Sequence, residues 1–212
     1  LPLDKIPGQT FNRPCFSPDG KVFFGVKTGL VSWDRRTDQW RHYWLPPDMR
    51  LLGEVYPVTP ALDHNGDLWI ACHRKGMAKA RISDDSLHML KRYDAPFGPL
   101  RAVAFWHCMT DRDGIVWVAT TGGLAPIDPA SGDALMLNEH WGLDEPDCNE
   151  RIFEQAADGC ILFTAGMKRE RRQHLHWFDP RDLILEDDPP GVLLESIAVL
   201  ENPLALDTAL AF

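Results

Sequence analysis

The sequence predicts an all-β protein built from repeated small antiparallel sheets, and three observations support this. An Asp-Gly or Asn-Gly turn occurs four times, with its glycine at Gly20, Gly66, Gly114 and Gly159, spaced 46, 48 and 45 residues apart. A short and almost wholly apolar segment follows each turn. A second glycine before Leu or Met then ends that segment. Four copies of one pattern in the same order indicate an internal repeat.

The first repeat shows how the expected elements follow one another. A first strand precedes the turn at residues 15–16, and a second, apolar strand follows it at residues 21–26. The second glycine reverses the chain into a third strand at residues 30–34, and a last strand covers residues 40–44. The equivalent first strands of the later repeats are residues 61–62, 102–105 and 152–153, and the other last strands are residues 88–93 and 134–138.

The apolar second strands indicate that the sheets pack against one another. The position three residues after the turn glycine holds Phe23, Trp69, Trp117 or Leu162, and its neighbours on both sides are also apolar. Strands that are buried on both faces have this composition. A single four-stranded sheet cannot bury both of its faces, whereas the blades of a β-propeller can, because they form a ring. We therefore expect about four blades, each with four antiparallel strands, as part of a larger propeller.

The composition of the chain changes near its C-terminal end. We expect propeller blades over residues 1–183 and a polar linker that ends in Pro189-Pro190 over residues 184–190. Residues 191–212 then read as the first strand of a β-sandwich domain that is cut short. Because the chain begins Leu-Pro-Leu-Asp, we expect it to be a fragment of a longer protein. The expected blade boundaries are residues 8–50, 51–97, 98–142 and 143–183.

Charge and composition exclude several classes of protein. The 22 Lys and Arg face 31 Asp and Glu, and the net charge of −9 disfavours a nucleic-acid partner. No apolar stretch is long enough to span a bilayer, so we expect any membrane attachment to lie in segments outside this sequence. A basic run at residues 168–172 is expected to be a solvated face, with docking of an anionic partner as the alternative.

The five cysteines do not form a Cys-x-x-Cys pair, and their odd number makes a poor disulfide framework. We interpret them as small buried hydrophobic side chains. One disulfide could still form in an oxidising compartment.

The repeats resemble the two-component regulator propeller repeat, whose core reads roughly Asp-x-x-Gly-x-Leu-Trp-Ile-Gly-Thr-x-x-Gly-Leu. Residues 111–124 resemble this core almost position by position, residues 63–77 with one insertion, and residues 17–30 without the Trp. The chain departs from the family in having only four repeats and in its fourth copy, which lacks the Trp.

The C-terminal end carries a second resemblance. Pro189-Pro190 and residues 192–197 are similar to the start of the Ig-like "three-tyrosine" domain that follows such propellers. Together the two resemblances cover residues 14–200.

The resemblance implies a ligand-sensing, non-catalytic fragment on the periplasmic (extracytoplasmic) side of the inner membrane. The parent would be a membrane-bound signal-transduction protein with a histidine kinase, often hybrid, or a diguanylate cyclase as its output. It implies an oligosaccharide or small-molecule ligand, a homodimer formed through the following domain, and no cofactor. Because a fold does not define a function, a propeller enzyme (a lyase or a glycan-active enzyme) and a protein-interaction scaffold are the alternatives.

The candidate ligand-binding residues lie in the segments that lead into the first strands, because propeller ligands usually meet loops at one end of the channel. Their side chains could bind a polar, sugar-like or anionic ligand by hydrogen bonds and ring stacking. The candidates are Arg13, Tyr56, Arg101, Asn149 and Arg151.

Three other motifs are better explained by a structural role than by metal binding or catalysis. Residues 63–67 resemble the start of a calcium loop, but the downstream Glu is missing, so we expect a turn. Asp111 and Asp113 could be a catalytic carboxylate pair, yet they belong to the repeated turn. His174 and His176 alternate along an expected strand without an identifiable third ligand for zinc. The sequence therefore predicts neither a catalytic residue nor a metal site.

Overall fold

The computed structural model describes residues 12–52, 58–93, 102, 104–143, 147–166, 174–183, 197–199 and 202–204. The chain divides into two compact units, residues 1–180 and residues 181–212. The first unit is an all-β arrangement of four antiparallel sheets, each of which has the strand order of a propeller blade.

The first two blades each contain four strands, and each strand pairs with the next one along the chain. The strands of blade 1 are β1 (Cys15–Phe16), β2 (Lys21–Val26), β3 (Gly29–Asp34) and β4 (Gln39–Trp44). The strands of blade 2 are β5 (Thr59–Leu62), β6 (Leu68–Cys72), β7 (Gly76–Ser83) and β8 (Ser86–Tyr93).

Blades 3 and 4 each contain three described strands rather than the four that the sequence predicts. In blade 3 the expected last strand is reduced to two isolated bridges, Leu124 with Leu137 and Ile127 with Ala134. In blade 4 residues 167–173 lie outside the described part. Blade 3 consists of β9 (Phe105–Thr110), β10 (Val116–Thr120) and β11 (Gly123–Ile127), and blade 4 of β12 (Cys148–Gln155), β13 (Ile161–Ala165) and β14 (His174–Phe178).

The first strand of blade 3 lies further along the chain than predicted. The sequence predicts it at residues 102–105, whereas β9 begins at Phe105 and continues to the turn at Asp111. The backbone of that turn determines the register, because Asp111 N–H donates to Ile115 O at 2.9 Å and Thr110 pairs with Val116. The strand therefore includes the polar residues His107 and Thr110, which an apolar pattern does not predict.

Helical structure is confined to short 3-10 turns in the described residues, none of which could cross a membrane. In the second unit β15 (Ile197–Val199) pairs with β16 (Asn202–Leu204). Most of the expected β-sandwich segment lies outside the described residues, so that assignment stays a prediction. The 3-10 turns are η2 (Pro47–Met49), η3 (Glu139–Trp141) and η5 (Pro180–Asp182).

The turn between the first and second strands has the same backbone in all four blades. In blade 2, Asp63 N–H donates to Asp67 O at 2.9 Å and Gly66 N–H donates back to Asp63 O at 3.0 Å. The turn glycine has a positive φ in every copy, between +80° at Gly66 and +100° at Gly159. Glycine adopts this conformation without the steric cost that a Cβ would bring, which explains why the glycine recurs.

In two blades an aspartate at the start of this turn holds the tryptophan of the second strand. Trp69 Nε1 donates to Asp63 Oδ2 at 3.0 Å, and Trp117 Nε1 donates to Asp111 Oδ2 at 2.6 Å. The second oxygen of each carboxylate accepts two backbone N–H groups of the turn. Both aspartates are buried, with 3% of their surface exposed, so the carboxylate satisfies donors that water cannot reach.

The other two blades lack both members of this pair. Blade 1 has Ser17 and Phe23 at the two positions, and blade 4 has Ala156 and Leu162. There the aspartate two residues further on, Asp19 or Asp158, takes over the acceptor role toward the turn. The aspartate and the tryptophan thus occur together or not at all, as expected if the indole N–H needs a buried acceptor.

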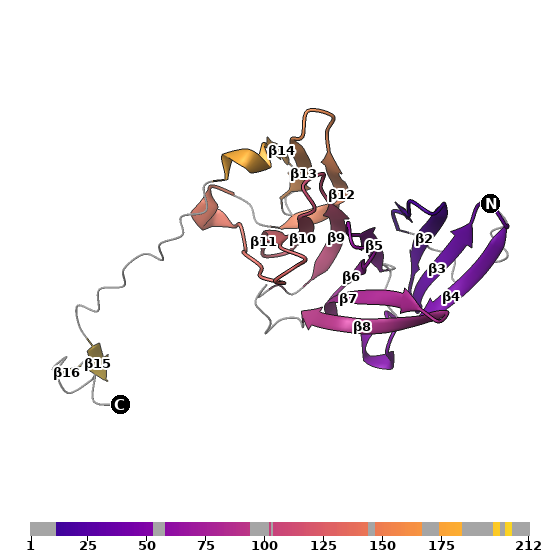
Figure 1. Cartoon of the computed structure of the whole chain (residues 1–212). Helices are drawn as coiled ribbons and strands as arrows, with labels where there is room; N and C mark the ends of the chain where they lie inside the picture. Colours follow the sequence, from indigo (N-terminus) through magenta and orange to yellow (C-terminus); the bar gives the residue numbers. More distant parts are fainter. Residues whose placement is uncertain are drawn as a thin grey trace. The chain divides into compact units, whose positions relative to one another are not determined.

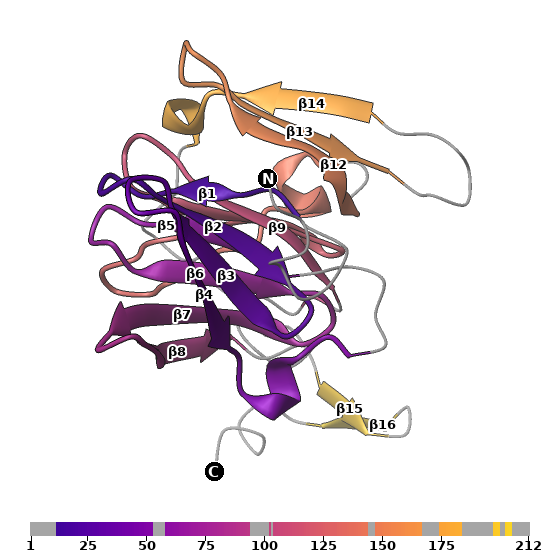
Figure 2. The same ribbon diagram turned by 90° about the vertical axis from the view of Figure 1, so that its right-hand side faces the viewer.

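The second strands are buried on both faces, and their alternating side chains join neighbouring blades. In β6, Leu68, Ile70 and Cys72 pack in a cluster with blade 1 residues, whereas Trp69 and Ala71 pack with blade 3 residues. The first strands of consecutive blades are neighbours, as in a propeller: β1 contacts β5, β5 contacts β9, and β9 contacts β12. Figures 1 and 2 show this succession of sheets.

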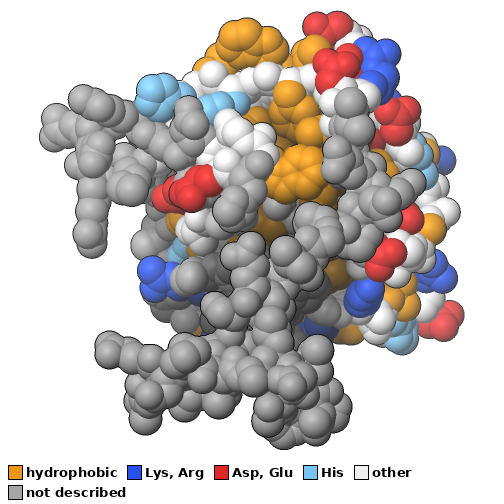
Figure 3. All heavy atoms as spheres, turned by 90° about the vertical axis from the view of Figure 1, so that its left-hand side faces the viewer, with side chains coloured by type: hydrophobic (Ala, Val, Ile, Leu, Met, Phe, Trp, Pro, Cys, Tyr) orange, Lys and Arg blue, Asp and Glu red, His pale blue; other side chains and the backbone are white. Residues whose placement is uncertain are grey.

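Most large apolar side chains are internal, but several reach the surface. Figure 3 shows hydrophobic side chains in the middle and at the upper edge of one face, with charged side chains gathered along its right-hand side. The most exposed large apolar residues include Trp177 (71%), Leu52 (69%), Phe16 (65%), Trp44 (57%), Leu175 (50%) and Leu90 (49%).

We expect Asp111 and Trp117 to be energetically coupled. Asp111→Ala should lower the free energy of unfolding by about 2–4 kcal/mol, because it leaves buried N–H donors without an acceptor. Combined with Trp117→Phe, the total loss should be smaller than the sum of the two single losses by about 1–3 kcal/mol. Urea unfolding of the two single variants and the double variant measures this coupling.

Asp158→Ala is the matched control, since this exposed aspartate accepts only a turn amide, that of Cys160 at 3.0 Å. Its loss should cost about 1 kcal/mol. Additive effects of the Asp111 and Trp117 substitutions would contradict the assignment of the pair.

Candidate functional site

The sequence-predicted site lies at one end of the blades, where β1, β5, β9 and β12 begin. We call this end the start rim. The chain carries polar side chains into it from the segment before β1, from the first residues of β5 and β9, and from β12. The starts of these strands lie together because the four strands are neighbours around the common axis.

Arg13, just before β1, connects the first blade to the later part of β12 in the fourth. Its Nη1 donates to Phe153 O at 2.5 Å, and its guanidinium forms an ion pair with Glu154. Both side chains keep about half of their surface exposed (41% and 55%). Since a guanidinium has five N–H donors, Arg13 retains capacity for a further acceptor.

A chain of hydrogen bonds connects the first three blades next to Arg13. Asn12 Nδ2 donates to Thr59 Oγ1 at 2.5 Å, and the Thr59 hydroxyl donates to Trp106 O at 3.0 Å. Thr59 is fully buried at the start of β5. The roles of Thr59 and Trp106 could not be predicted from the sequence, because a threonine or a tryptophan in a strand carries no signal of its own.

An aromatic pair lies beside this network. The rings of His73, which follows β6, and Trp106, in β9, lie 4.5 Å apart between centroids at an angle of 38°. His73 is buried and Trp106 is half-buried. The start rim therefore combines a cationic group, an amide and aromatic surface.

The other predicted binding residues are less fully described. Tyr56 and Arg101 lie outside the described residues. Asn149 and Arg151 lie in β12, but only their backbone is described. The structure brings Arg13 to β12, the strand that carries Asn149 and Arg151, but its contacts there are with Phe153 and Glu154, near the other end of that strand.

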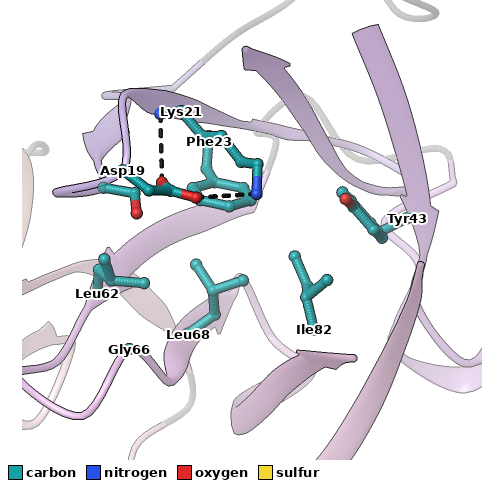
Figure 4. Close-up of a pocket in the computed structure, with 9 residues that line it drawn as sticks. Asp19, Lys21, Phe23, Tyr43, Leu62, Gly66, Leu68 and Ile82 are labelled. Carbon is teal, nitrogen blue, oxygen red and sulfur yellow. Dashed lines mark hydrogen bonds and ion pairs between the residues drawn. The ribbon is translucent and has the colours of Figure 1, made fainter. Parts of the chain in front are cut away.

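A small cleft lies between blades 1 and 2 at the opposite end (Figure 4). Its volume is about 160 Å³, which is less than the several hundred Å³ of ordinary ligand pockets. An ion pair between Lys21 Nζ and Asp19 Oδ2, 2.9 Å apart, lies beside Phe23. Hydrogen bonding by Ser17 and then by Lys21 lowers the pKa of Asp19 to about 2. We interpret this cleft as a gap in the packing between blades.

Blade 2 contains a cluster of acidic and basic side chains, a composition that metal and catalytic sites also have. Lys79 Nζ lies 3.3 Å from Asp63 Oδ2 and 3.2 Å from Asp67 Oδ2, and Arg81 binds Asp67 through two N–H groups at 2.5 and 2.9 Å. Lys79 also lies over the Trp69 ring, 5.3 Å from its centroid. These carboxylates are saturated by protein donors, so the cluster stabilises the blade.

Metal-binding geometry is not found in the part of the chain that the structure describes: no three His, Cys, Asp or Glu side chains gather there as a metal site. His174 and His176 do share one face of β14, with ring centroids 6.3 Å apart, and His176 stacks on Phe163 at 5.1 Å. The stacking indicates a packing role for His176.

All five cysteines are free thiols. Cys72, Cys108 and Cys148 are buried, and Cys15 and Cys160 are half-buried. Burial raises the pKa of Cys72 and that of Cys148 to about 12, which keeps these thiols neutral and unreactive at neutral pH.

Comparison with known proteins shows the fold of the chain. No family model matches the sequence, and no curated protein matches it. The extracellular domain of the hybrid two-component system BT3049 from Bacteroides thetaiotaomicron superimposes with a TM-score of 0.59 at 15% identity, over 80% of this chain and 23% of that chain. The corresponding domain of BT4673 from the same organism gives a TM-score of 0.61 at 16% identity, over 82% and 23%.

An enzyme shares the same fold. A luciferin-regenerating enzyme superimposes with a TM-score of 0.54 at 10% identity, over 79% of this chain and 60% of that chain. The chain spans about a quarter of the length of the solved extracellular domains of the two-component systems that it resembles. At these identities the likeness establishes a shared propeller-type fold.

We expect acid to weaken the charge cluster of blade 2. Burial by itself would raise the pKa of Asp67, but hydrogen bonds from Arg81 and Lys79 outweigh it and hold this pKa below its usual range. Because the folded-state pKa is lowered, the stabilisation is complete above the unfolded-state pKa of about 3.9 and declines as the pH falls through the folded-state value.

Asp67→Asn should therefore lower stability by about 1–3 kcal/mol at pH 7 and have a smaller effect at pH 3, as measured by urea unfolding at both pH values. Asp48→Asn is the exposed control, because solvent screens the ion pair between Asp48 and Arg92. A loss of equal size at pH 3 and pH 7 would contradict this account of Asp67.

Proposed function

We propose that the chain is the propeller part of an extracytoplasmic, ligand-sensing region of a membrane-bound signal-transduction protein. The extracellular domains of the two-component systems that share its fold support this proposal. The repeat pattern of the sequence supports it independently, because it resembles the repeat of that class of sensor. The location would be the periplasmic side of the inner membrane.

The contact between Arg13 and Glu154 carries the proposal. It joins the segment before β1 to the later part of β12, and it remains partly exposed. A ligand with a carboxylate or clustered hydroxyl groups would compete for the same guanidinium donors. Binding would then change a contact between the two terminal blades of the chain.

We infer an oligosaccharide or a small polar molecule as the ligand. Arg13 and Asn12 offer hydrogen-bond donors for hydroxyl or anionic groups, and the half-buried ring of Trp106 offers flat apolar surface. The predicted residues Tyr56, Arg101, Asn149 and Arg151 would add to this set.

The signal would pass as a shift between two arrangements of the following domain in a homodimer. A ligand shifts such an equilibrium only by as much as its affinity differs between the two states. The output, a histidine kinase or a diguanylate cyclase, would lie outside these 212 residues. A propeller enzyme is the second candidate, because the luciferin-regenerating enzyme shares the fold; it would convert its ligand as well as bind it.

A ligand screen of the chain tests the proposal. We expect at least one class of oligosaccharide or small polar metabolite to raise the melting temperature in a thermal-shift assay and to bind in calorimetry. Arg13→Ala should weaken that binding roughly tenfold or more, because it removes charge-assisted hydrogen bonds.

Arg112→Ala is the matched control, because Arg112 also bonds a carbonyl of blade 4, donating to Ala157 O at 2.7 Å, but in the turns at the other end of the blades. It should leave ligand binding unchanged. Folded protein that no ligand class stabilises would refute a sensor. Turnover of the bound ligand would identify an enzyme instead.

A further inference from the structure

The segment that follows β4 is fastened to the hairpin between β2 and β3 of the same blade. Leu45 N–H donates to Thr28 O at 3.0 Å, and Leu51 N–H donates to Lys27 O at 2.7 Å. Between these two bonds the chain forms η2, which Figure 2 shows as a short coil after the arrowhead of β4. Leu45, Met49 and Leu51 are buried, with at most 1% of their surface exposed. The segment is therefore a fixed support for the side chains that it carries at the surface.

This segment holds the side chain of Arg50 in one place. Arg50 Nε donates to Leu45 O at 2.7 Å, and the guanidinium carbon lies over the Trp44 ring, 5.1 Å from its centroid. A guanidinium above an indole is attracted to the negative face of the ring. Together the hydrogen bond and the ring contact restrict the side chain, so a ligand that binds it has less conformational entropy to remove.

Arg50 has no carboxylate partner among the residues that the structure describes. Asp48 is its nearest acidic neighbour in the sequence, but Asp48 Oδ2 accepts from Arg92 Nη1 at 2.8 Å instead. The terminal nitrogens of Arg50 therefore keep their four N–H groups for another acceptor, in a fork that matches the two oxygens of a carboxylate. Several arginines of the chain do form ion pairs with acidic side chains, namely Arg13, Arg41, Arg81 and Arg92.

Aromatic and polar groups lie beside this guanidinium. Trp44 is 57% exposed, so its indole offers apolar surface next to the charge. The His42 ring lies 4.0 Å from the Trp44 ring at an angle of 84°, and His42 Nε2 shares a 3.0 Å hydrogen bond with the Thr28 hydroxyl. Burial, and then the charge of Arg50, lower the pKa of His42, so this imidazole is neutral at pH 7. Of these two side chains only Arg50 is charged.

We propose that Arg50 and Trp44 form a binding site for a carboxylate that is attached to a ring. The two carboxylate oxygens would accept hydrogen bonds from the two terminal nitrogens of Arg50. The attached ring would lie against the exposed part of the indole and bury apolar surface there. Aromatic acids and sugar acids share this chemistry.

The site is separate from the candidate ligand residues of the proposed sensor. It is built from β4 and the segment after β4, whereas Asn12 and Arg13 precede β1 and Trp106 lies in β9. The inference therefore does not rest on the proposed function. Failure at one of the two sites leaves the other unaffected.

Binding of matched acids and amides tests the site. The probes are benzoate with benzamide and glucuronate with glucuronamide, because within each pair an uncharged amide replaces the carboxylate. The indole N–H signals of the nitrogen-15-labelled chain report binding by NMR at constant ionic strength, and Trp44→Phe identifies the signal of Trp44.

We expect at least one acid to shift the Trp44 signal with a Kd of about 1–10 mM, as befits a ligand of this size. Its amide should bind roughly tenfold more weakly or less, because it lacks the charge-assisted pair of hydrogen bonds. The acid that binds more tightly, benzoate or glucuronate, distinguishes an aromatic from a sugar source.

Arg50→Gln should weaken binding of that acid roughly tenfold or more and leave binding of the amide unchanged. An arginine that only fastens the segment through Leu45 O would not separate the acid from the amide. Arg74→Gln is the matched control, because Arg74 is an exposed arginine at the same end of the blades, in the hairpin between β6 and β7. Circular dichroism checks folding, and Arg50→Lys, which keeps the charge but loses the fork, replaces Arg50→Gln if that variant does not fold.

Three results would overturn the proposal. The first is a Trp44 signal that neither acid shifts at concentrations up to about 50 mM. The second is an acid that binds no more tightly than its amide. The third is binding of the acid that Arg50→Gln weakens no more than Arg74→Gln does.

Discussion

The structure depends on the burial of each second strand on both of its faces. A strand such as β6 has Leu68, Ile70 and Cys72 on one side and Trp69 and Ala71 on the other, and none of these side chains contacts water. One sheet cannot provide that burial, so a blade such as blade 2 depends on a neighbour on each side. The same constraint makes the first strands adjacent and thereby creates the start rim.

The aspartate of the turn supports this packing from within. A tryptophan between two blades fills a large volume, but its indole N–H must be satisfied where water is excluded. Asp63 and Asp111 provide that acceptor and at the same time close the turn. In blades 1 and 4 this position holds Phe23 or Leu162, whose side chains have no N–H group to satisfy. The aspartate is replaced there by Ser17 and Ala156. The turn aspartate and the strand tryptophan therefore change together from one repeat to the next.

Arg13 concerns the relation between the first and fourth blades. The ion pair of Arg13 with Glu154 joins them within one chain. In the proposed sensor, a ligand that displaces Glu154 from Arg13 would act where the terminal blades meet. The buried charges of blade 2 have a different role, because Lys79 and Arg81 saturate Asp67 and leave no group for chemistry.

The local features of the fold could be predicted from the sequence alone. The turn glycines, the apolar second strands and the number of blades follow from residue type and spacing, because positive φ angles and two-sided burial each demand particular side chains. The start of β9 and the loss of a continuous fourth strand in blade 3 could not be predicted in this way, since register depends on hydrogen bonds across strands. Of the candidate site, the sequence indicated Arg13, but only the tertiary structure decided that it pairs with Glu154 and lies beside Thr59 and Trp106. Those contacts join residues 47 and 140 positions apart, and no local pattern records such distances along the chain.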